Sequence, residues 1–126
     1  MRINIIYEND VAKRFLFNDN ISFLVLENTE NNSLIIDGMM GLQKISFEHS
    51  LLYAGTMTIE EKQKDDFIDF VNFLITYAKD KDFQKITITP TSILSLYMSE
   101  CKEALRALGF VFPRSRYANI EKKLTS

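Results

Sequence analysis

The fold of this chain is decided by residues 67–78, Phe-Ile-Asp-Phe-Val-Asn-Phe-Leu-Ile-Thr-Tyr-Ala, and by residues 85–90, Lys-Ile-Thr-Ile-Thr-Pro. The first stretch has an apolar stripe with the 3.6-residue period of a helix, formed by Phe67, Phe70, Val71, Leu74 and Ala78. The second stretch is rich in β-branched residues and stops at a proline, which cannot donate to a strand ladder, so it predicts a strand. A helix and a strand joined by a short charged turn are half of a βαβ unit.

The flanking residues extend this unit in both directions. Thr58 and Glu61 have the spacing of a capping box and predict the start of the helix. Beyond residue 90, Ser99 is a plausible N-cap for a second helix that carries Cys101, Ala104, Leu105 and Leu108 and ends at Gly109. Residues 111–120 then predict a last strand, and a charged tail is expected over residues 121–126.

The first half of the chain predicts strands. Short β-branched and aromatic runs are bounded by Asn, Asp and Gly, as in strands joined by turns; they are residues 3–7, 21–26, 33–37, 42–47 and 51–57. We therefore expect antiparallel strands over residues 3–57 and a helix-strand-helix-strand unit over residues 58–120. The expected fold class is α/β (α+β), a mixed, mostly antiparallel sheet with two main helices. The length of 126 residues predicts one domain, residues 1–126.

Charge and rare residues exclude several function classes. Fifteen basic and seventeen acidic residues give a net charge of −2, which disfavours DNA as a partner. Residues 83–126 hold seven basic and three acidic side chains, so an anion site is expected there. One cysteine and one histidine allow no intramolecular disulfide and predict no metal site. The chain has no signal-like or membrane-spanning apolar run, so we expect a cytoplasmic protein without membrane contact.

The order of motifs in residues 33–120 is similar to that of a known superfamily. Tyr53-Ala54-Gly55 precedes the helix, a Lys-Ile strand enters Pro90, and Ala104-Leu105-Arg106-Ala107-Leu108-Gly109-Phe110 precedes the last strand. This order resembles the GNAT-fold acyltransferase superfamily, and most closely a single domain of the Fem-type aminoacyltransferase-like group. The resemblance implies the GNAT-like fold and a transferase that uses acetyl-CoA, another acyl donor or an aminoacyl-tRNA.

Two features depart from the GNAT pattern. GNAT enzymes hold the pyrophosphate of acetyl-CoA on a glycine-rich turn at a helix start, whereas residues 56–61 here contain no glycine and end in two glutamates. Leu105 also occupies the position of the tyrosine that many GNAT enzymes use as general acid. An acetyl-CoA site is therefore disfavoured. For the first helices of the fold, which usually shape the acceptor site, only residues 9–17 remain.

The candidate ligand-binding residues lie in two places. Tyr53, Gly55 and Thr56 would face the acyl donor if residues 51–57 and 85–89 are neighbours in one sheet; the alternative is a core tyrosine with a bulge glycine. Arg114 and Arg116 share one face of the expected last strand and could bind a phosphate or carboxylate; the alternative is a pair of solvated edge charges.

The remaining candidates are weaker. His49 could act as a general base, with a surface histidine as the alternative. Cys101 could act as a nucleophile near a helix start, with an apolar-face cysteine as the alternative. Met39-Met40 could pack on a partner or fill a gap in the core.

Two functions follow from these observations. The first is an acyl- or aminoacyl-transferase with a degenerate acyl-CoA phosphate turn, whose catalytic residues are not identified. The second is a non-catalytic GNAT-like module that binds a protein partner or forms a homodimer.

Overall fold

The computed structural model describes residues 2–18, 21–28, 30, 32–37, 60–90, 92–115 and 118–124. Within these residues the chain forms a six-stranded sheet and three helices. In chain order the elements are β1 (Ile3–Glu8), β2 (Ala12–Phe17), β3 (Ile21–Asn28), β4 (Ser33–Asp37), α2 (Glu61–Asp80), β5 (Lys85–Ile88), α3 (Ser92–Glu100), α4 (Lys102–Ala107) and β6 (Ile120–Lys123).

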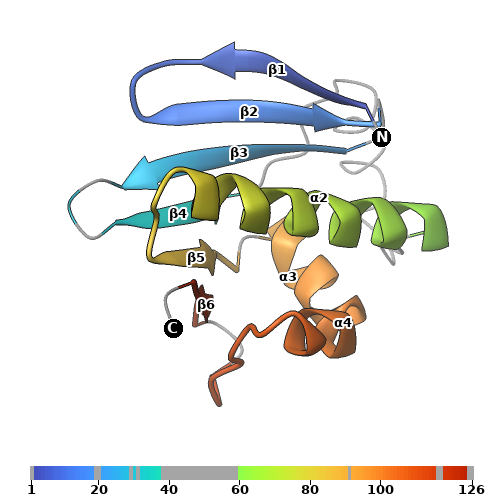
Figure 1. Ribbon diagram of the computed structural model, residues 1–126. Coiled ribbons are helices and arrows are strands. Elements are labelled where there is room, and N and C mark those ends of the chain that lie inside the picture. The colour runs from blue at the N-terminus through green and yellow to red at the C-terminus, as the bar shows by residue number, and fades with distance from the viewer. Residues whose placement is uncertain are drawn as a thin grey trace.

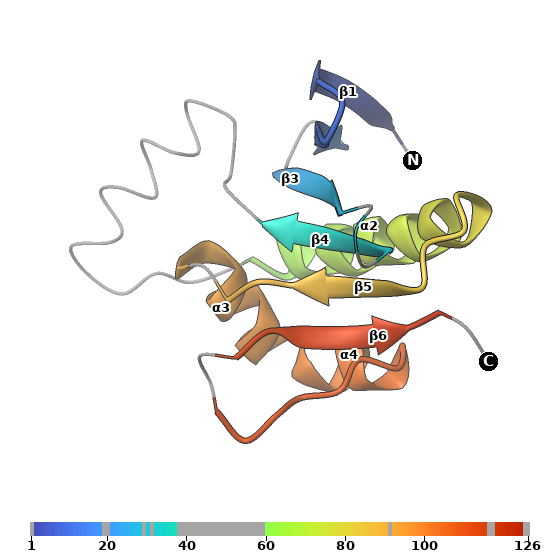
Figure 2. The same ribbon diagram turned by 90° about the vertical axis from the view of Figure 1, so that its left-hand side faces the viewer.

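The sheet keeps the order of the chain, β1-β2-β3-β4-β5-β6. Four of the five neighbouring pairs are antiparallel, and β4 pairs with β5 in parallel. A parallel pair needs a long crossover between its strands, and the 20-residue helix α2 lies in that connection. The sheet is therefore mixed and mostly antiparallel, which confirms the expected fold class. Figure 2 shows β4, β5 and β6 side by side with α2 and α4 behind them.

Aromatic side chains fill the space between the sheet and α2. Phe15, Phe17 and Phe23 come from β2 and β3 and are at most 2% exposed. Their rings meet those of Phe67 and Phe70 on α2 at centroid distances of 5.6 to 5.9 Å. Such tilted, edge-on and stacked pairs contribute about 0.5–1.5 kcal/mol each beyond the area they bury. Figure 1 shows α2 lying across the middle of the sheet.

The helical stripe predicted for α2 is confirmed, but the cap is not the expected one. All five residues of the stripe are fully buried. The helix starts at Glu61 with Glu60 as its N-cap, and the capping box is made by Glu60 and Gln63 instead of Thr58 and Glu61. The Gln63 side chain accepts the Glu60 backbone N–H at 3.1 Å. Thr58 lies outside the described residues.

The second half contains one more helix than expected. Ser99 lies inside α3 and caps nothing, while Cys101 stands at the N-cap of α4. The sequence pattern missed α3 because Pro90 and the Ser-rich residues that follow resemble a loop. The predicted stop at Gly109 is confirmed: its φ is +102°, its N–H donates to the carbonyl of Arg106 and the N–H of Phe110 to that of Leu105. These two bonds form a Schellman motif.

The last strand lies further along the sequence than predicted. It spans Ile120–Lys123, where a charged tail was expected. Among residues 111–115 and 118–119, only Val111 makes a ladder contact, a bridge to Glu121. Ile120 is 1% exposed opposite Ile88, and Glu121 forms an ion pair with Lys85 at 2.7 Å. The charged residues of β6 can therefore join the sheet, because residues of β5 pair with them.

Two other expectations are wrong. Residues 9–17 were the only ones available for the first helices of a GNAT fold, but Ala12–Phe17 is strand β2, with Phe15 and Phe17 alternating toward the core. Residues 51–57 were expected beside residues 85–89, but Lys85–Ile88 is already flanked by β4 on one side and β6 on the other. No ladder position remains there for residues 51–57, which lie outside the described residues.

Candidate functional site

The start of α2 is the place where an acyl-CoA phosphate would bind in a GNAT-like fold. Here the N-cap and the first helical residue are Glu60 and Glu61, and the capping box already uses the backbone N–H groups of Glu60 and Gln63. Glu61 also forms an ion pair with Lys64 at 3.1 Å. A pyrophosphate placed here would face two carboxylates and donors that are already used.

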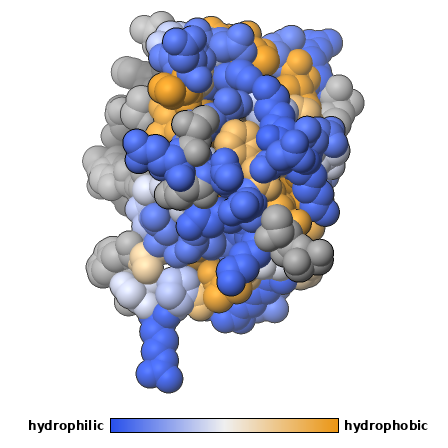
Figure 3. Space-filling view, turned by 60° about the vertical axis from the view of Figure 1, so that its left-hand side comes forward, coloured by the Kyte–Doolittle hydropathy of each residue, from blue (hydrophilic) through white to orange (hydrophobic). Residues whose placement is uncertain are grey.

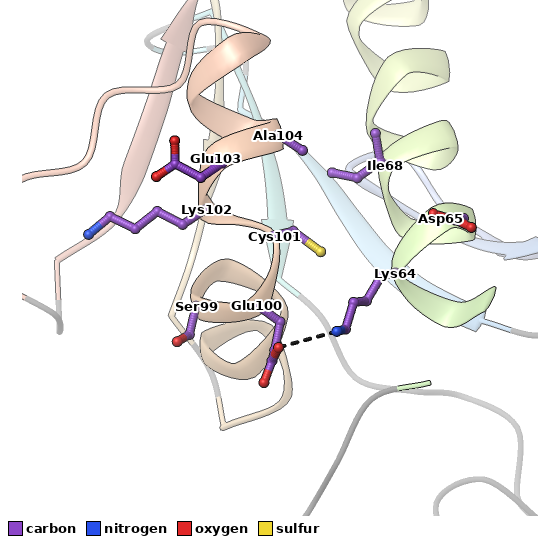
Figure 4. A pocket seen from close by; sticks show the side chains of 9 residues that line it. All are labelled: Lys64, Asp65, Ile68, Ser99, Glu100, Cys101, Lys102, Glu103 and Ala104. Atoms are coloured by element: carbon purple, nitrogen blue, oxygen red, sulfur yellow. Dashed lines mark ion pairs between the residues drawn. The ribbon is translucent and has the colours of Figure 1, made fainter. Parts of the chain in front are cut away.

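An open hollow of about 480 Å³ lies between the first turns of α2 and the junction of α3 and α4. Lys64, Asp65 and Ile68 line it from α2, and residues 99–104 line it from the other side. An ion pair between Lys64 and Glu100, 3.3 Å long, spans its mouth (Figure 4). The hydrogen bonds to Glu61 and Glu100 raise the pKa of Lys64 above its usual value. This cation is neutralised on both sides by the protein itself.

Cys101 points its sulfur toward α2 inside this hollow (Figure 4). The residue is 5% exposed, and burial raises the pKa of the thiol to about 11. A nucleophilic cysteine needs a lowered pKa, because the thiolate is the reactive form. The structure therefore favours the apolar-face alternative for Cys101.

Most of the other residues predicted to form a site lie outside the described part of the chain. Tyr53, Gly55, Thr56 and Arg116 lie outside the described residues, as do His49 and Met39-Met40. Arg114 is exposed at a bend after α4.

The last third of the chain uses two of its cations on an aromatic ring. Arg106 lies over the ring of Phe112, 5.6 Å from its centroid, and Lys102 lies at the same distance. Arg106 also pairs with Glu103 at 3.7 Å. Both cations are thus held by the protein's own groups.

The structure shows a polar cluster that the sequence reasoning missed. The Lys13 ammonium donates to the Tyr77 hydroxyl at 2.6 Å and to Glu27 at 3.3 Å, and the hydroxyl donates to Glu27 at 2.8 Å. The bond to Tyr77 and the pairing with Glu27 raise the pKa of Lys13. Burial alone would raise the pKa of Glu27, but the bonds from Tyr77 and Lys13 outweigh it and lower that pKa. The signal for this cluster in the sequence was one charged residue at a core-facing position of each of two strands, Lys13 in β2 and Glu27 in β3.

Strand β1 presents an exposed apolar edge. It is the first strand of the sheet and has β2 as its neighbour on one side; within the part of the chain that the structure describes, nothing pairs with its other side. Ile5, Ile6 and Tyr7 are 50%, 47% and 51% exposed, and Val11 in the following turn is 57% exposed. A free strand edge with apolar side chains is a template for pairing with another strand.

Among the described residues, no group of three or more His, Cys, Asp or Glu side chains could hold a metal ion. None of the helices in the described ranges is long and apolar enough to cross a membrane. No family model, curated protein or solved structure matches this chain.

Proposed function

We propose that this chain is a non-catalytic GNAT-like module that acts by binding a protein partner or a second copy of itself. The observation that carries the proposal is the outer edge of β1, which is unpaired among the described strands and where apolar side chains stand about half exposed. Large apolar side chains gathered on an unpaired edge are typical of a surface that another chain covers.

The start of α2 supports the same proposal. A transferase that uses acyl-CoA needs open N–H donors and a site free of negative charge for the pyrophosphate. Glu60 and Glu61 occupy this position, and Gln63 completes the cap. Leu105, at the position of the general-acid tyrosine in the GNAT pattern, is fully buried and offers no proton.

The hollow beside α2 favours a second candidate, an acyl- or aminoacyl-transferase. It is large enough for part of a substrate and is bounded by the helix that precedes β5. Its cation Lys64 is already paired with Glu61 on its own helix and with Glu100 on the opposite side of the hollow, which is why we rank this candidate second.

Calorimetric titration with acetyl-CoA separates the module from a transferase that uses an acyl-CoA donor. The module predicts no saturable heat with acetyl-CoA, coenzyme A or a longer acyl-CoA. The transferase predicts saturable heat that is lost in Ala104→Trp, which fills the hollow, and kept in Ala107→Trp, which is exposed on the same helix. Saturable heat with this pattern would overturn the proposed function.

A further inference from the structure

The side chains of β1 divide between the two faces of the sheet. Residues opposite each other on neighbouring strands share a face. Ile3 and Ile5 stand opposite Phe17 and Phe15, which face the core, and Glu8 stands opposite Lys13, whose ammonium reaches Tyr77 on α2. Asn4 and Tyr7 stand opposite Leu16 and Arg14, on the outer face.

A β-bulge makes this pattern symmetric. The register of β1 against β2 shifts between Ile5 and Tyr7, so Ile6 is an extra residue. The residues at equal distances on either side of the Ile5–Ile6 bond therefore share a face. Asn4 and Tyr7 both lie on the outer face, and Ile3 and Glu8 both lie on the core face. Without the extra residue, Ile3 and Glu8 would lie on opposite faces.

This symmetry allows a register, for two copies related by a twofold axis, in which opposite residues share a face. An antiparallel pair requires that opposite residues share a face. Placing Ile3 opposite the second copy's Glu8 puts Asn4 opposite the second copy's Tyr7, and both pairs match. A shift by one residue would place Ile3 opposite Tyr7, or Asn4 opposite Glu8, and neither pair shares a face.

The charges of the segment favour the same arrangement. Arg2 stands before the strand, whereas Glu8 and Asp10 stand at its end and in the following turn. Glu8 lies 3.8 Å from Lys13 of its own chain with about half of its side chain exposed, and Asp10 adds a second carboxylate; antiparallel pairing of two copies brings these carboxylates of each copy toward Arg2 of the other. A parallel pair would place like charges together.

From these observations we infer that two copies of this chain pair antiparallel through the outer edges of their β1 strands, with which none of the described strands pairs, and form one continuous sheet. Ile5 and Ile6 of each copy meet at the twofold axis, where their exposed side chains are covered. Figure 3 shows orange hydrophobic side chains reaching the surface between blue hydrophilic ones at the upper end of the molecule, where β1 lies in Figure 1. The inference rests on the proposed function and names its surface and its partner.

Sedimentation velocity of the full chain from micromolar to millimolar concentration tests the dimer. We expect a monomer–dimer equilibrium that Ile6→Lys weakens about tenfold or more, because two cations would meet at the axis. Val111→Lys is the matched control: this residue is 70% exposed beside β6, at the other end of the sheet, and its change should leave the dissociation constant unaltered. A monomer at every concentration, or a dimer insensitive to Ile6→Lys, would overturn the inference.

Disulfide trapping tests the register. In a Cys101→Ser background, chains carrying Asn4→Cys are mixed with chains carrying Tyr7→Cys under mild oxidation. Directly opposite residues of a strand pair have Cβ atoms about 4.5–5.5 Å apart, close to what a disulfide requires. We expect cross-linked dimer in the mixture and little in either variant alone. Equal cross-linking in the separate samples would overturn the register.

The dimer and the proposed function can be contradicted independently of each other. A monomer that gives no heat with acyl-CoA overturns the dimer and leaves the binding module, with a strand of another protein as the occupant of the edge. Saturable acyl-CoA heat overturns the module, whatever the mass of the particle in solution.

Discussion

Replacing Tyr77 with phenylalanine tests whether the Lys13–Tyr77–Glu27 cluster stabilises the fold. The hydroxyl accepts from Lys13 at 2.6 Å and donates to Glu27 at 2.8 Å, whereas the ring packs against Phe15 with a centroid distance of 5.9 Å. The variant removes the two hydrogen bonds and keeps the ring. The change in unfolding free energy therefore reports on the hydroxyl.

The expected loss is about 2 kcal/mol. A hydrogen bond to a charged group contributes about 1.5–3 kcal/mol, which sets an upper limit of about 3–6 kcal/mol for two bonds. The loss is smaller than this limit because Lys13 and Glu27 remain 3.3 Å apart and keep their ion pair, and because their side chains are 15% and 18% exposed to water.

Urea unfolding measures this loss. With a slope of about 2 kcal/mol per molar urea, the midpoint should fall by about 1 M at an unchanged slope. Tyr7→Phe is the control, because Tyr7 is half exposed and its hydroxyl accepts a hydrogen bond from the exposed Asn9 amide at 2.9 Å. We expect this change to alter stability by less than about 0.5 kcal/mol. A loss for Tyr77→Phe no larger than that of the control would refute the reasoning.

Four further predictions concern single positions. Asp82, just after α2, has φ +63°, so Asp82→Gly should raise the unfolding free energy by about 0.5–1 kcal/mol. Gly109 has φ +102°, so Gly109→Ala should lower the unfolding free energy by about 0.5–1 kcal/mol or more. Thermal unfolding checks both variants, and a loss of stability in Asp82→Gly would contradict the argument. The Tyr97 hydroxyl is buried and has no hydrogen-bond partner among the described residues, so Tyr97→Phe should leave stability equal or up to about 1 kcal/mol higher in urea unfolding; a clear loss would reveal a partner. Cys101 should react slowly with a thiol reagent at neutral pH and fast after unfolding, and fast labelling of the folded chain would show that the thiol is activated. Because folding lowers the pKa of Glu27, this carboxylate stabilises the fold fully above its ordinary pKa of 4.5, and the contribution is lost as pH falls through the lower pKa of the folded chain. The stability of Glu27→Gln, followed by circular dichroism, should therefore depend less on pH below 4.5 than that of the unchanged chain. The same pH dependence in both proteins would contradict this role of Glu27.

Much of the fold follows from local patterns in the sequence. The stripe from Phe67 to Ala78 indicates which side of α2 is buried, because its period matches the helix regardless of what packs on it. Gly109 indicates where α4 ends, because the required backbone conformation is cheap only for glycine. The strands around Ile21 and Leu34 were also found, since their β-branched and aromatic runs are short and bounded by turn residues.

The candidate site could not be predicted in the same way. The expected groove depended on which strands flank Lys85–Ile88, and that choice is made by long-range pairing that no local pattern encodes. Cys101 stands near a helix start in the sequence, yet only packing against α2 shows that the thiol is buried and its pKa raised.

What the sequence determined by itself is the type and facing of the main elements, because helix and strand periods are properties of a short segment. Only the tertiary structure decided where each strand stands in the sheet. Ile120–Lys123 has the composition of a surface tail and becomes a strand because Lys85 and Ile88 on β5 pair with its side chains. Ile3–Glu8 has the composition of an interior strand and stands at the edge, because chain order became sheet order and left its apolar side chains half exposed.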